Sequence, residues 1–253
     1  MIELTAADGH RFSAYRADPA DAPRGAVVVI QELSGVDAHI RSVAENLAAN
    51  GYVAIAPALF DRVKSGVELG YSAAEFAEGM ELTRQLGLDG LLADIQAAAD
   101  AVRDAGRIAC LGYCWGGYLA YTSANRVNGL SCAIGYYGGG IAEGYSTKRS
   151  IPTLLHFGEH DAQIPNESVA ALRAQRPDVT AYTYAAGHGF DCEQRDSYDA
   201  DAARVALERT LFWISQYVVG QTPVALKNAG AYAQQKVDKK KKKASEDLGP
   251  PAQ

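Results

Sequence analysis

The sequence predicts an α/β fold: a single doubly wound, mostly parallel sheet flanked by helices. Two observations support this prediction. Short apolar runs alternate with amphipathic stretches of helical length almost from end to end. The chain has 253 residues, of which 48% are hydrophobic and 21% charged, as is typical of a soluble globule. This length fits one compact catalytic-sized domain, which we place at residues 1–219.

The expected strands are of two kinds. Segment 10–15 alternates polar and apolar residues, which predicts a half-exposed antiparallel strand, and 179–184 alternates again, which places it near the sheet edge. Continuous apolar runs predict strands buried on both faces. These runs are 26–30, 52–56, 108–111 and 153–157, and Cys132 is expected in one further strand.

Helical stretches separate these strands. In the segment 90–105, Leu91, Ile95 and Val102 share one face, as in a helix that packs on a sheet. Strands that alternate with such helices imply parallel pairing through right-handed crossovers, with ligands at the carboxyl ends of the central strands. The expected helices cover 38–49, 73–86, 90–105, 115–126, 166–175 and 198–219.

Charge and composition exclude several classes of protein. The chain has 24 basic and 30 acidic side chains, which argues against a globally basic nucleic-acid-binding protein. No apolar run approaches the roughly 18 residues of a membrane span, and the N-terminus lacks the pattern of a secretion signal. Four cysteines are too few for a disulfide scaffold. We expect a cytoplasmic monomer or weak homodimer without nucleic-acid or membrane partners.

The C-terminal segment differs in kind from the rest. Five consecutive lysines occupy 239–243, and Gly249-Pro250-Pro251 follows. Because such a block of like charges repels itself, we predict that 220–253 is a flexible Lys-rich tail. It serves either solubility or weak contact with polyanions.

The most informative motif, Gly112-Tyr113-Cys114-Trp115-Gly116, joins a buried strand to a helix. It is a G-x-nucleophile-x-G elbow with cysteine as the nucleophile. A β-carbon at either glycine would clash, because strand and helix approach closely there, and the central residue is held in a strained conformation. The helix N-terminus favours a thiolate and a developing oxyanion. The alternative is a glycine-rich turn around a structural cysteine.

An elbow of this kind predicts an acid and then a histidine on later loops. Asp161 lies 47 residues after Cys114 and follows a predicted strand, and His188 follows the next strand. We expect His188 to accept the thiol proton and Asp161 to orient the imidazole. Glu159 and His160 adjoin Asp161 and are its rivals for that role.

The other histidines and cysteines are assigned to structure. His156 is expected to be a core histidine, and Cys110 and Cys132 to be buried small hydrophobes. Cys192 is expected in a pocket wall or the core, with a second nucleophile as the alternative. The histidines expected at the surface are His10 and His39.

A second loop completes the predicted site. The first buried strand ends in the segment 31–35, and in this architecture such a loop supplies one oxyanion donor. We assign the donors to the backbone N–H groups of Leu33 and Trp115. Glu32 is expected within reach of Cys114, where its carboxylate could take or hold the thiol proton. A solvated loop carboxylate is the alternative.

These motifs resemble the dienelactone hydrolase family of α/β-hydrolases. The matching pieces are 31–35, 112–117, the Asp161 loop and 187–190, in the family's order. The resemblance implies an α/β-hydrolase fold, a triad of Cys114, His188 and Asp161, and Glu32 as an accessory carboxylate that helps to generate the thiolate when substrate binds. It implies no metal or organic cofactor, and hydrolysis of a lactone such as 4-carboxymethylenebut-2-en-4-olide to maleylacetate.

The sequence departs from the family at one position. Members that act on dienelactone are expected to hold the substrate carboxylate with an arginine four residues after the histidine, where this chain has Cys192. Arg195, Arg84 or Arg62 could serve instead. The residues that could wall an apolar pocket are Tyr113, Trp115, Tyr136, Tyr137 and Phe190, with structural packing as the other interpretation of Tyr136 and Tyr137.

We therefore expect a hydrolase in which Cys114 attacks a small lactone or activated ester and forms an acyl-thioester that His188 helps water to release. Another cysteine-dependent esterase or thioesterase on the same scaffold is one alternative. A non-catalytic thiol sensor that uses Cys114 for redox chemistry is the other.

Overall fold

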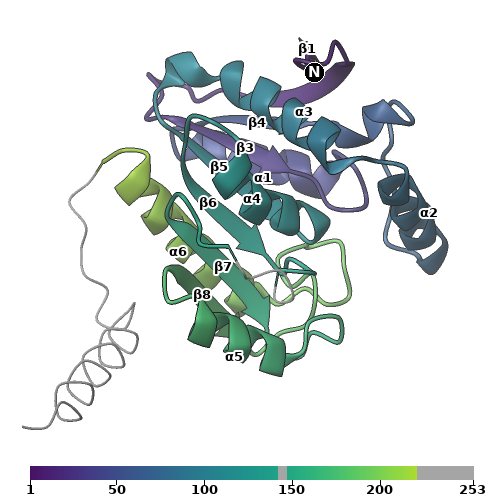
Figure 1. The fold of residues 1–253 in the computed structure, drawn as a ribbon, viewed down its shortest axis with the longest axis vertical. Helices are drawn as coiled ribbons and strands as arrows, with labels where there is room; N and C mark the ends of the chain where they lie inside the picture. Colours follow the sequence, from purple (N-terminus) through teal and green to yellow (C-terminus); the bar gives the residue numbers. More distant parts are fainter. Residues whose placement is uncertain (142–146, 221–253) are drawn as a thin grey trace, which may run out of the picture.

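The computed structural model describes residues 1–141 and 147–220, which form one sheet with helices on both faces (Figure 1). Within these residues the sheet has eight strands in the order β1-β2-β4-β3-β5-β6-β7-β8. The two N-terminal strands pair antiparallel and the others parallel, so the predicted fold class is confirmed. The strands are β1 (Ile2–Thr5), β2 (Arg11–Ala17), β3 (Ala26–Ile30), β4 (Val53–Pro57), β5 (Ile108–Tyr113), β6 (Leu130–Tyr136), β7 (Thr153–Gly158) and β8 (Val179–Tyr184).

The helices agree closely with the sequence pattern. They are α1 (Ala38–Ala49), α2 (Ala73–Arg84), α3 (Leu88–Asp100), α4 (Trp115–Arg126), α5 (Asn166–Gln175) and α6 (Ala200–Tyr217), with the short 3₁₀ helices η1 (Leu59–Arg62) and η2 (Arg103–Ala105). The expectation of one continuous helix over 90–105 is wrong, because α3 ends at Asp100 and η2 is separate. Strand β1 was not predicted, since four half-exposed residues carry too little pattern.

Side-chain caps fix where several helices begin. The carboxylate of Asp37 accepts a hydrogen bond from Ile40 N at 3.0 Å, which starts α1 directly after the loop that follows β3. Ser72 caps α2 in the same way within a reciprocal capping box, and Asp199 caps α6. Each cap satisfies amide groups that the first helical turn leaves unpaired.

The core lies in two layers, one on each side of the sheet. Val27 and Val29 of β3 pack with residues of α1 and α6, whereas Val28 and Ile30 pack with α3 and α4. Because successive side chains of a strand point to opposite faces, a strand covered on both sides must be apolar throughout. This explains the unbroken apolar run over 26–30.

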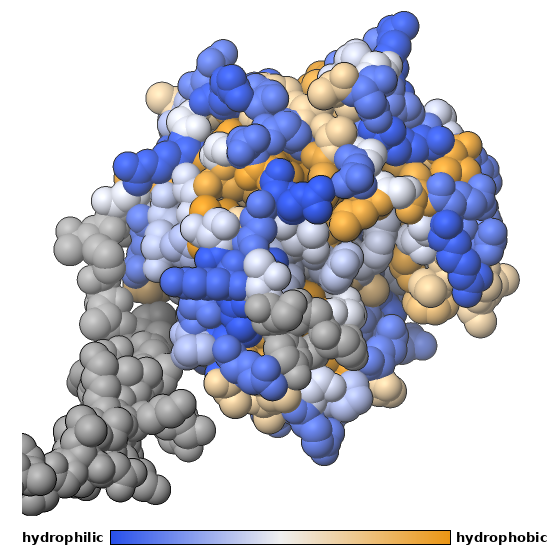
Figure 2. Space-filling view, in the orientation of Figure 1, coloured by the Kyte–Doolittle hydropathy of each residue, from blue (hydrophilic) through white to orange (hydrophobic). Residues whose placement is uncertain are grey.

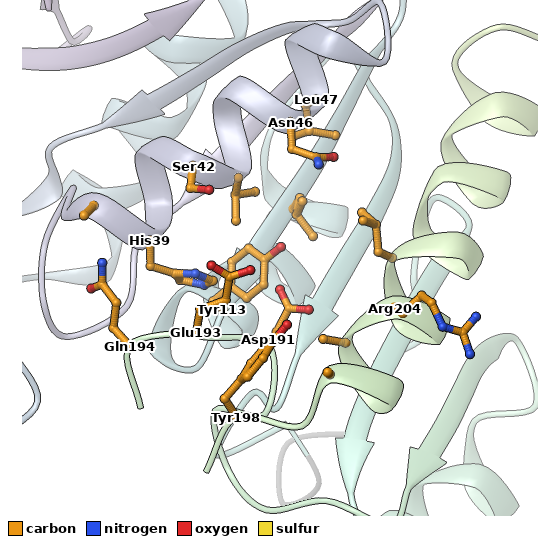
Figure 3. Close-up of a pocket in the computed structure, with 16 residues that line it drawn as sticks. His39, Ser42, Asn46, Leu47, Tyr113, Asp191, Glu193, Gln194, Tyr198 and Arg204 are labelled. Atoms are coloured by element: carbon orange, nitrogen blue, oxygen red, sulfur yellow. The ribbon is translucent and has the colours of Figure 1, made fainter. Parts of the chain in front are cut away.

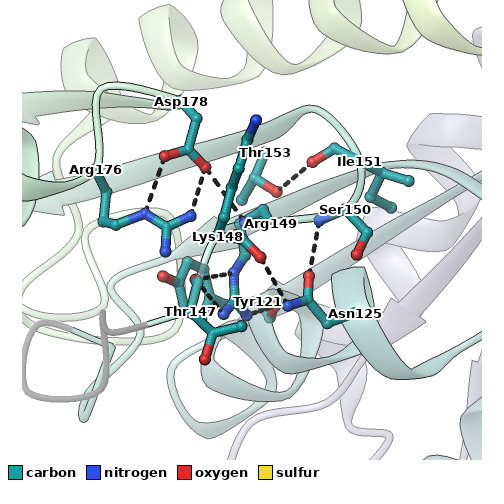
Figure 4. A network of polar contacts seen from close by, with 10 residues as sticks. All are labelled: Tyr121, Asn125, Thr147, Lys148, Arg149, Ser150, Ile151, Thr153, Arg176 and Asp178. Atoms are coloured by element: carbon teal, nitrogen blue, oxygen red, sulfur yellow. Dashed lines mark hydrogen bonds and ion pairs between the residues drawn. The ribbon is translucent and has the colours of Figure 1, made fainter.

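A polar network fixes the start of β7 against its neighbours (Figure 4). Arg149 donates from its backbone N to Asp178 Oδ2 at 3.3 Å and from Nη1 to the carbonyl of Tyr121 at 3.0 Å. Its guanidinium also lies 4.1 Å from the ring centre of Tyr121. The amide oxygen of Asn125 accepts from Ser150 N at 2.8 Å. These contacts join the approach to β7 to α4 and to the residue before β8.

Hydrophilic side chains cover most of the face drawn in Figure 2 and surround its apolar areas. Among the described residues, no helix is both long and apolar enough to cross a bilayer. The predicted Lys-rich tail lies outside the described residues, apart from Gly220. The described large apolar side chains that are exposed are Met1, Val63, Phe76, Tyr198 and Val219.

Candidate active site

The carboxyl ends of β5, β7 and β8 bring the three predicted catalytic side chains together. Cys114 directly follows β5 and begins α4, Asp161 lies on the loop after β7, and His188 lies on the loop after β8. His188 Nε2 lies 3.1 Å from Cys114 Sγ, and His188 Nδ1 lies 2.7 Å from Asp161 Oδ2. The rivals Glu159 and His160 are exposed. The arrangement can pass a proton from the thiol to the imidazole.

The turn at Cys114 is as tight as the motif predicts. Cys114 has a φ of 50°, which is rare for a residue with a side chain, so the backbone is strained there. A β-carbon on Gly112 would lie 2.0 Å from the Gly116 carbonyl oxygen, and one on Gly116 would lie 2.4 Å from the Gln31 oxygen. Both positions therefore require glycine, and the sulfur is held at the head of α4.

The loop that carries Asp161 fixes its carboxylate. Asp161 Oδ1 accepts hydrogen bonds from the backbone N–H groups of Gln163 at 2.8 Å and Ile164 at 3.2 Å. The other oxygen is then directed at His188. A carboxylate held in this way selects the imidazole tautomer with a proton on Nδ1 and leaves Nε2 to face the sulfur.

The environment of His188 favours its protonated form. Burial by itself lowers the pKa of the imidazole. The hydrogen bonds to Asp161 and Cys114 and the charges of both groups raise it by more, so that the pKa is about 10. At neutral pH the ring is then an imidazolium beside the sulfur. A cation at this position, together with the helix N-terminus, stabilises a thiolate.

We expect the stability of the fold to decrease with pH because of His188. Its pKa is 6.5 in the reference state and about 10 in the folded protein, so the folded form binds the proton more tightly. The contribution of His188 to the free energy of unfolding is complete below about pH 6.5 and is lost as pH rises towards 10. Over that range the free energy of unfolding falls by up to about 1.4 kcal/mol per pH unit. Urea unfolding between pH 6 and 10 measures it. In His188→Gln the slope between about pH 6.5 and 8, below the range in which the buried cysteines titrate, should be shallower by this amount. Parallel curves for the two proteins would contradict the assignment.

Glu32 reaches the site, but its carboxylate contacts groups other than the thiol. The side chain is buried, Oε1 accepts from the hydroxyl of Tyr137 at 3.0 Å, and Oε2 lies 3.2 Å from Arg195 Nη1. Glu32 and Cys114 line one small cavity of about 20 Å³. The cavity is also lined by Leu33, Ser34, Gly70, Tyr71, Glu75, Phe76 and Arg195.

The backbone around Leu33 is closely held. A β-carbon on Gly79 of α2 would lie 2.5 Å from the Leu33 carbonyl oxygen, and one on Gly35, which has a φ of 85°, would lie 2.1 Å from the Val67 oxygen. Neither Leu33 N nor Trp115 N forms a hydrogen bond with the part of the chain that the structure describes. Both amides are therefore available as donors.

Of the three arginines considered from the sequence, the structure places Arg195 in the site. Arg62 forms a bidentate pair with Asp94, and Arg84 is exposed on α2. Arg195 instead lies 5.5 Å from the ring centre of Tyr71, at the cavity shared with Cys114. The sequence gives no signal for Tyr71 or for the bond from Tyr137 to Glu32.

His156 and the three other cysteines are buried as predicted, His10 is half-buried, and the prediction for His39 needs correction. His156 is fully buried and bonded to Tyr184 and Thr210, and burial lowers the pKa of its ring to about 3. Cys110, Cys132 and Cys192 are buried. The expectation that His39 lies at the surface is wrong. It is 7% exposed, because it lies in the first turn of α1 and packs edge-on against Tyr113.

Within residues 1–141 and 147–220, no group of three or more His, Cys, Asp or Glu side chains is arranged to hold a metal ion. The side chains that the structure brings together are a cysteine, a histidine and two carboxylates, with an arginine beside one of them. Such a set can perform nucleophilic attack, proton transfer and binding of an anionic group.

Comparison with known proteins identifies the family of the chain. A model of the Dienelactone hydrolase family matches residues 12–218. Carboxymethylenebutenolidase 1 from Cupriavidus pinatubonensis is 30% identical over 220 residues, which cover 83% of this chain and 94% of the relative. The carboxymethylenebutenolidase of Pseudomonas putida is 30% identical over 225 residues, which cover 85% and 95%.

The crystal structure of a candidate dienelactone hydrolase from Klebsiella pneumoniae aligns with a TM-score of 0.74 at 29% identity, over 85% of this chain and 98% of that chain. The family match spans the strands and loops that carry Cys114, Asp161 and His188. The chain therefore belongs to the dienelactone hydrolase family and is a hydrolase that acts on esters or lactones.

Proposed function

We propose that Cys114 is the nucleophile of a lactone hydrolase, with His188 as acid and base and Asp161 as the group that orients it. The observation that carries this proposal is the continuous relay from Asp161 Oδ2 through His188 to Cys114 Sγ, with contacts of 2.7 and 3.1 Å. A strained turn at a helix N-terminus adds electrostatic support for the thiolate.

The reaction has two halves. The Cys114 thiolate attacks the lactone carbonyl, and the N–H groups of Leu33 and Trp115 stabilise the oxyanion, each by roughly 3 kcal/mol in comparable sites. The ring C–O bond then breaks, and His188 donates its proton to the departing oxygen, so that the opened product remains attached as a thioester. His188 next removes a proton from water, which attacks the thioester and releases the acid and the thiolate.

Arg195 and Glu32 suggest how a carboxylated lactone would be accepted. The relatives named carboxymethylenebutenolidase point to a carboxymethylene-substituted butenolide, which is a carboxylated lactone. A substrate carboxylate bound by Arg195 would compete with Glu32, whose Oε2 now lies 3.2 Å from that guanidinium. Glu32 would then be free to turn towards Cys114 and to assist His188 in holding the thiol proton. Since the cavity of about 20 Å³ holds little more than one water, lining side chains must move to admit the substrate.

Cys192 favours a second candidate, an esterase or thioesterase for substrates without a carboxylate. It stands where the family places an arginine, and its thiol donates to the Tyr71 hydroxyl at 3.2 Å rather than offering a charge. The thiol sensor would use Cys114 without forming an acyl-enzyme. Mass spectrometry after brief exposure to a panel of lactones and esters tests all three functions. We expect a covalent adduct of the ring-opened lactone on Cys114, and no adduct with any ester or lactone would reject the hydrolase mechanism.

Replacing Arg195 by glutamine should separate the two substrate classes. We expect kcat/KM for a carboxylated lactone to fall about 100-fold, because a charge-assisted bidentate contact is lost, and to change little for p-nitrophenyl acetate. Arg84→Gln, which removes an exposed arginine on α2, is the matched control. Equal losses on both substrates would mean that Arg195 positions Glu32 rather than binding the substrate carboxylate.

A further inference from the structure

A second cavity, of about 400 Å³, lies between α1, α6 and the segment 191–198 (Figure 3). It shares no lining residue with the small cavity at Cys114. Its volume falls within the range of small-molecule sites. The proposed hydrolysis makes no use of this space.

The cavity has an apolar body and a polar end. Val43 and Leu47 of α1 and Leu207 of α6 line the apolar part. At the polar end, Figure 3 shows the carboxylate of Asp191 next to Tyr113 and directed into the space between the two helices. A ligand that fits must therefore combine an apolar body with one polar group.

The polar end is negatively charged. Burial raises the pKa of Asp191 to about 6, although the charge of His39 and a hydrogen bond from Tyr113 act to lower it, and no ion pair joins this carboxylate to a lysine or arginine within the part of the chain that is described. Glu193 adds a second carboxylate to the lining, also without an ion pair among the described residues. Arg204 does not neutralise them, because its guanidinium lies 2.8 Å from Glu208. An anion would be repelled here.

A buried histidine adds a second, independent observation. His39 lines the cavity, and its Nε2 is buried without a hydrogen-bond partner among the described residues. Few buried polar atoms in native proteins lack a partner, and those that do call for a specific explanation, such as a water or an ion. His39 therefore leaves one buried polar atom at this end of the cavity without a partner among the described residues.

We propose that this cavity binds a small organic ammonium ion, with its charged nitrogen at Asp191 and Glu193 and its apolar body against Val43, Leu47 and Leu207. An ammonium group supplies three N–H donors to carboxylate acceptors, which a neutral molecule of the same shape cannot do. A bare metal ion fits poorly, because the His, Asp and Glu side chains of the described lining are not arranged as a group that could hold one.

Titration of ¹⁵N-labelled full-length protein with benzylamine at pH 7.5, where the amine is protonated, tests the proposal. Benzyl alcohol is the neutral probe of matched shape. We expect amide shifts in α1, α6 and residues 191–198, and affinity for benzylammonium at least about 10-fold higher than for the alcohol. Asp191→Asn should abolish this preference. Ser42→Trp, at an exposed position in the lining, should block both probes.

Asp196→Asn is the matched control, since it removes an exposed carboxylate from the same loop outside the cavity lining. It should retain the preference for the ammonium probe. Equal affinities for benzylammonium and benzyl alcohol in the unaltered protein would overturn the proposal, and this comparison requires no variant to fold. Shifts confined to residues around Cys114, or a preference that survives in Asp191→Asn, would overturn it as well.

Discussion

Replacing Cys114 by alanine should lower kcat/KM for lactone hydrolysis by at least about 10⁴-fold. The expected loss is large because, in the proposed mechanism, the sulfur is both the attacking atom and the carrier of the acyl group. The substitution removes only the sulfur atom and leaves the backbone at the start of α4 unchanged, so the fold should persist. Initial rates on a dienelactone or an activated ester measure the effect, and circular dichroism checks the fold.

Cys132→Ala provides the matched control for this substitution. Cys132 is fully buried in β6 and contributes no atom to the cavity at Cys114. We expect this variant to be slightly less stable than the parent but to retain its turnover. Unchanged lactone hydrolysis by Cys114→Ala would reject Cys114 as the nucleophile.

The substitution Asp161→Asn should reduce kcat by about 10⁴-fold, although the side chain keeps its shape. The amide would donate to His188 Nδ1 in place of accepting from it, and the ring proton would move to Nε2, which faces Cys114 Sγ at 3.1 Å. The imidazole could then no longer accept the thiol proton. Loss of the carboxylate also removes a charge that raises the pKa of His188.

Two measurements distinguish this effect from simple destabilisation. The rate of Cys114 alkylation by iodoacetamide near neutral pH should fall with kcat, because the thiolate fraction depends on the imidazolium. Glu159→Gln removes an exposed carboxylate from the same loop and should leave both quantities unchanged. If Glu159→Gln lost as much activity as Asp161→Asn, Glu159 would be the orienting acid.

The sequence predicts those parts of the fold that depend on local pattern. The run over 26–30 is apolar because both of its faces are covered, and α1, α4 and α5 begin and end where their periodicity indicates. The elbow is predictable for the same reason, since only glycine avoids a steric clash at positions 112 and 116, and both glycines are visible in the sequence. Strand β1 is too short to show a recognisable pattern of apolar and polar residues.

The surroundings of the triad depend on contacts between distant residues. The hydrogen bond from Tyr137 to Glu32 spans 105 positions, and the contact of Arg195 with Glu32 spans 163. One sequence does not reveal which of several arginines reaches a loop so far away. His39 shows the same limit: its burial results from packing against Tyr113, 74 positions later, and its own neighbours in the chain give no sign of it.

The position of β8 in the sheet has a consequence for how this enzyme loses activity. Among the described residues β8 is an edge strand that pairs only with β7, whereas β5 lies between β3 and β6. The edge of a sheet opens at lower free energy than its centre. Local unfolding of β8 would move His188 away from Cys114 Sγ while the central strands of the sheet remain folded. We therefore expect the proposed relay of Asp161, His188 and Cys114 to be lost on warming before the interior of the sheet unfolds.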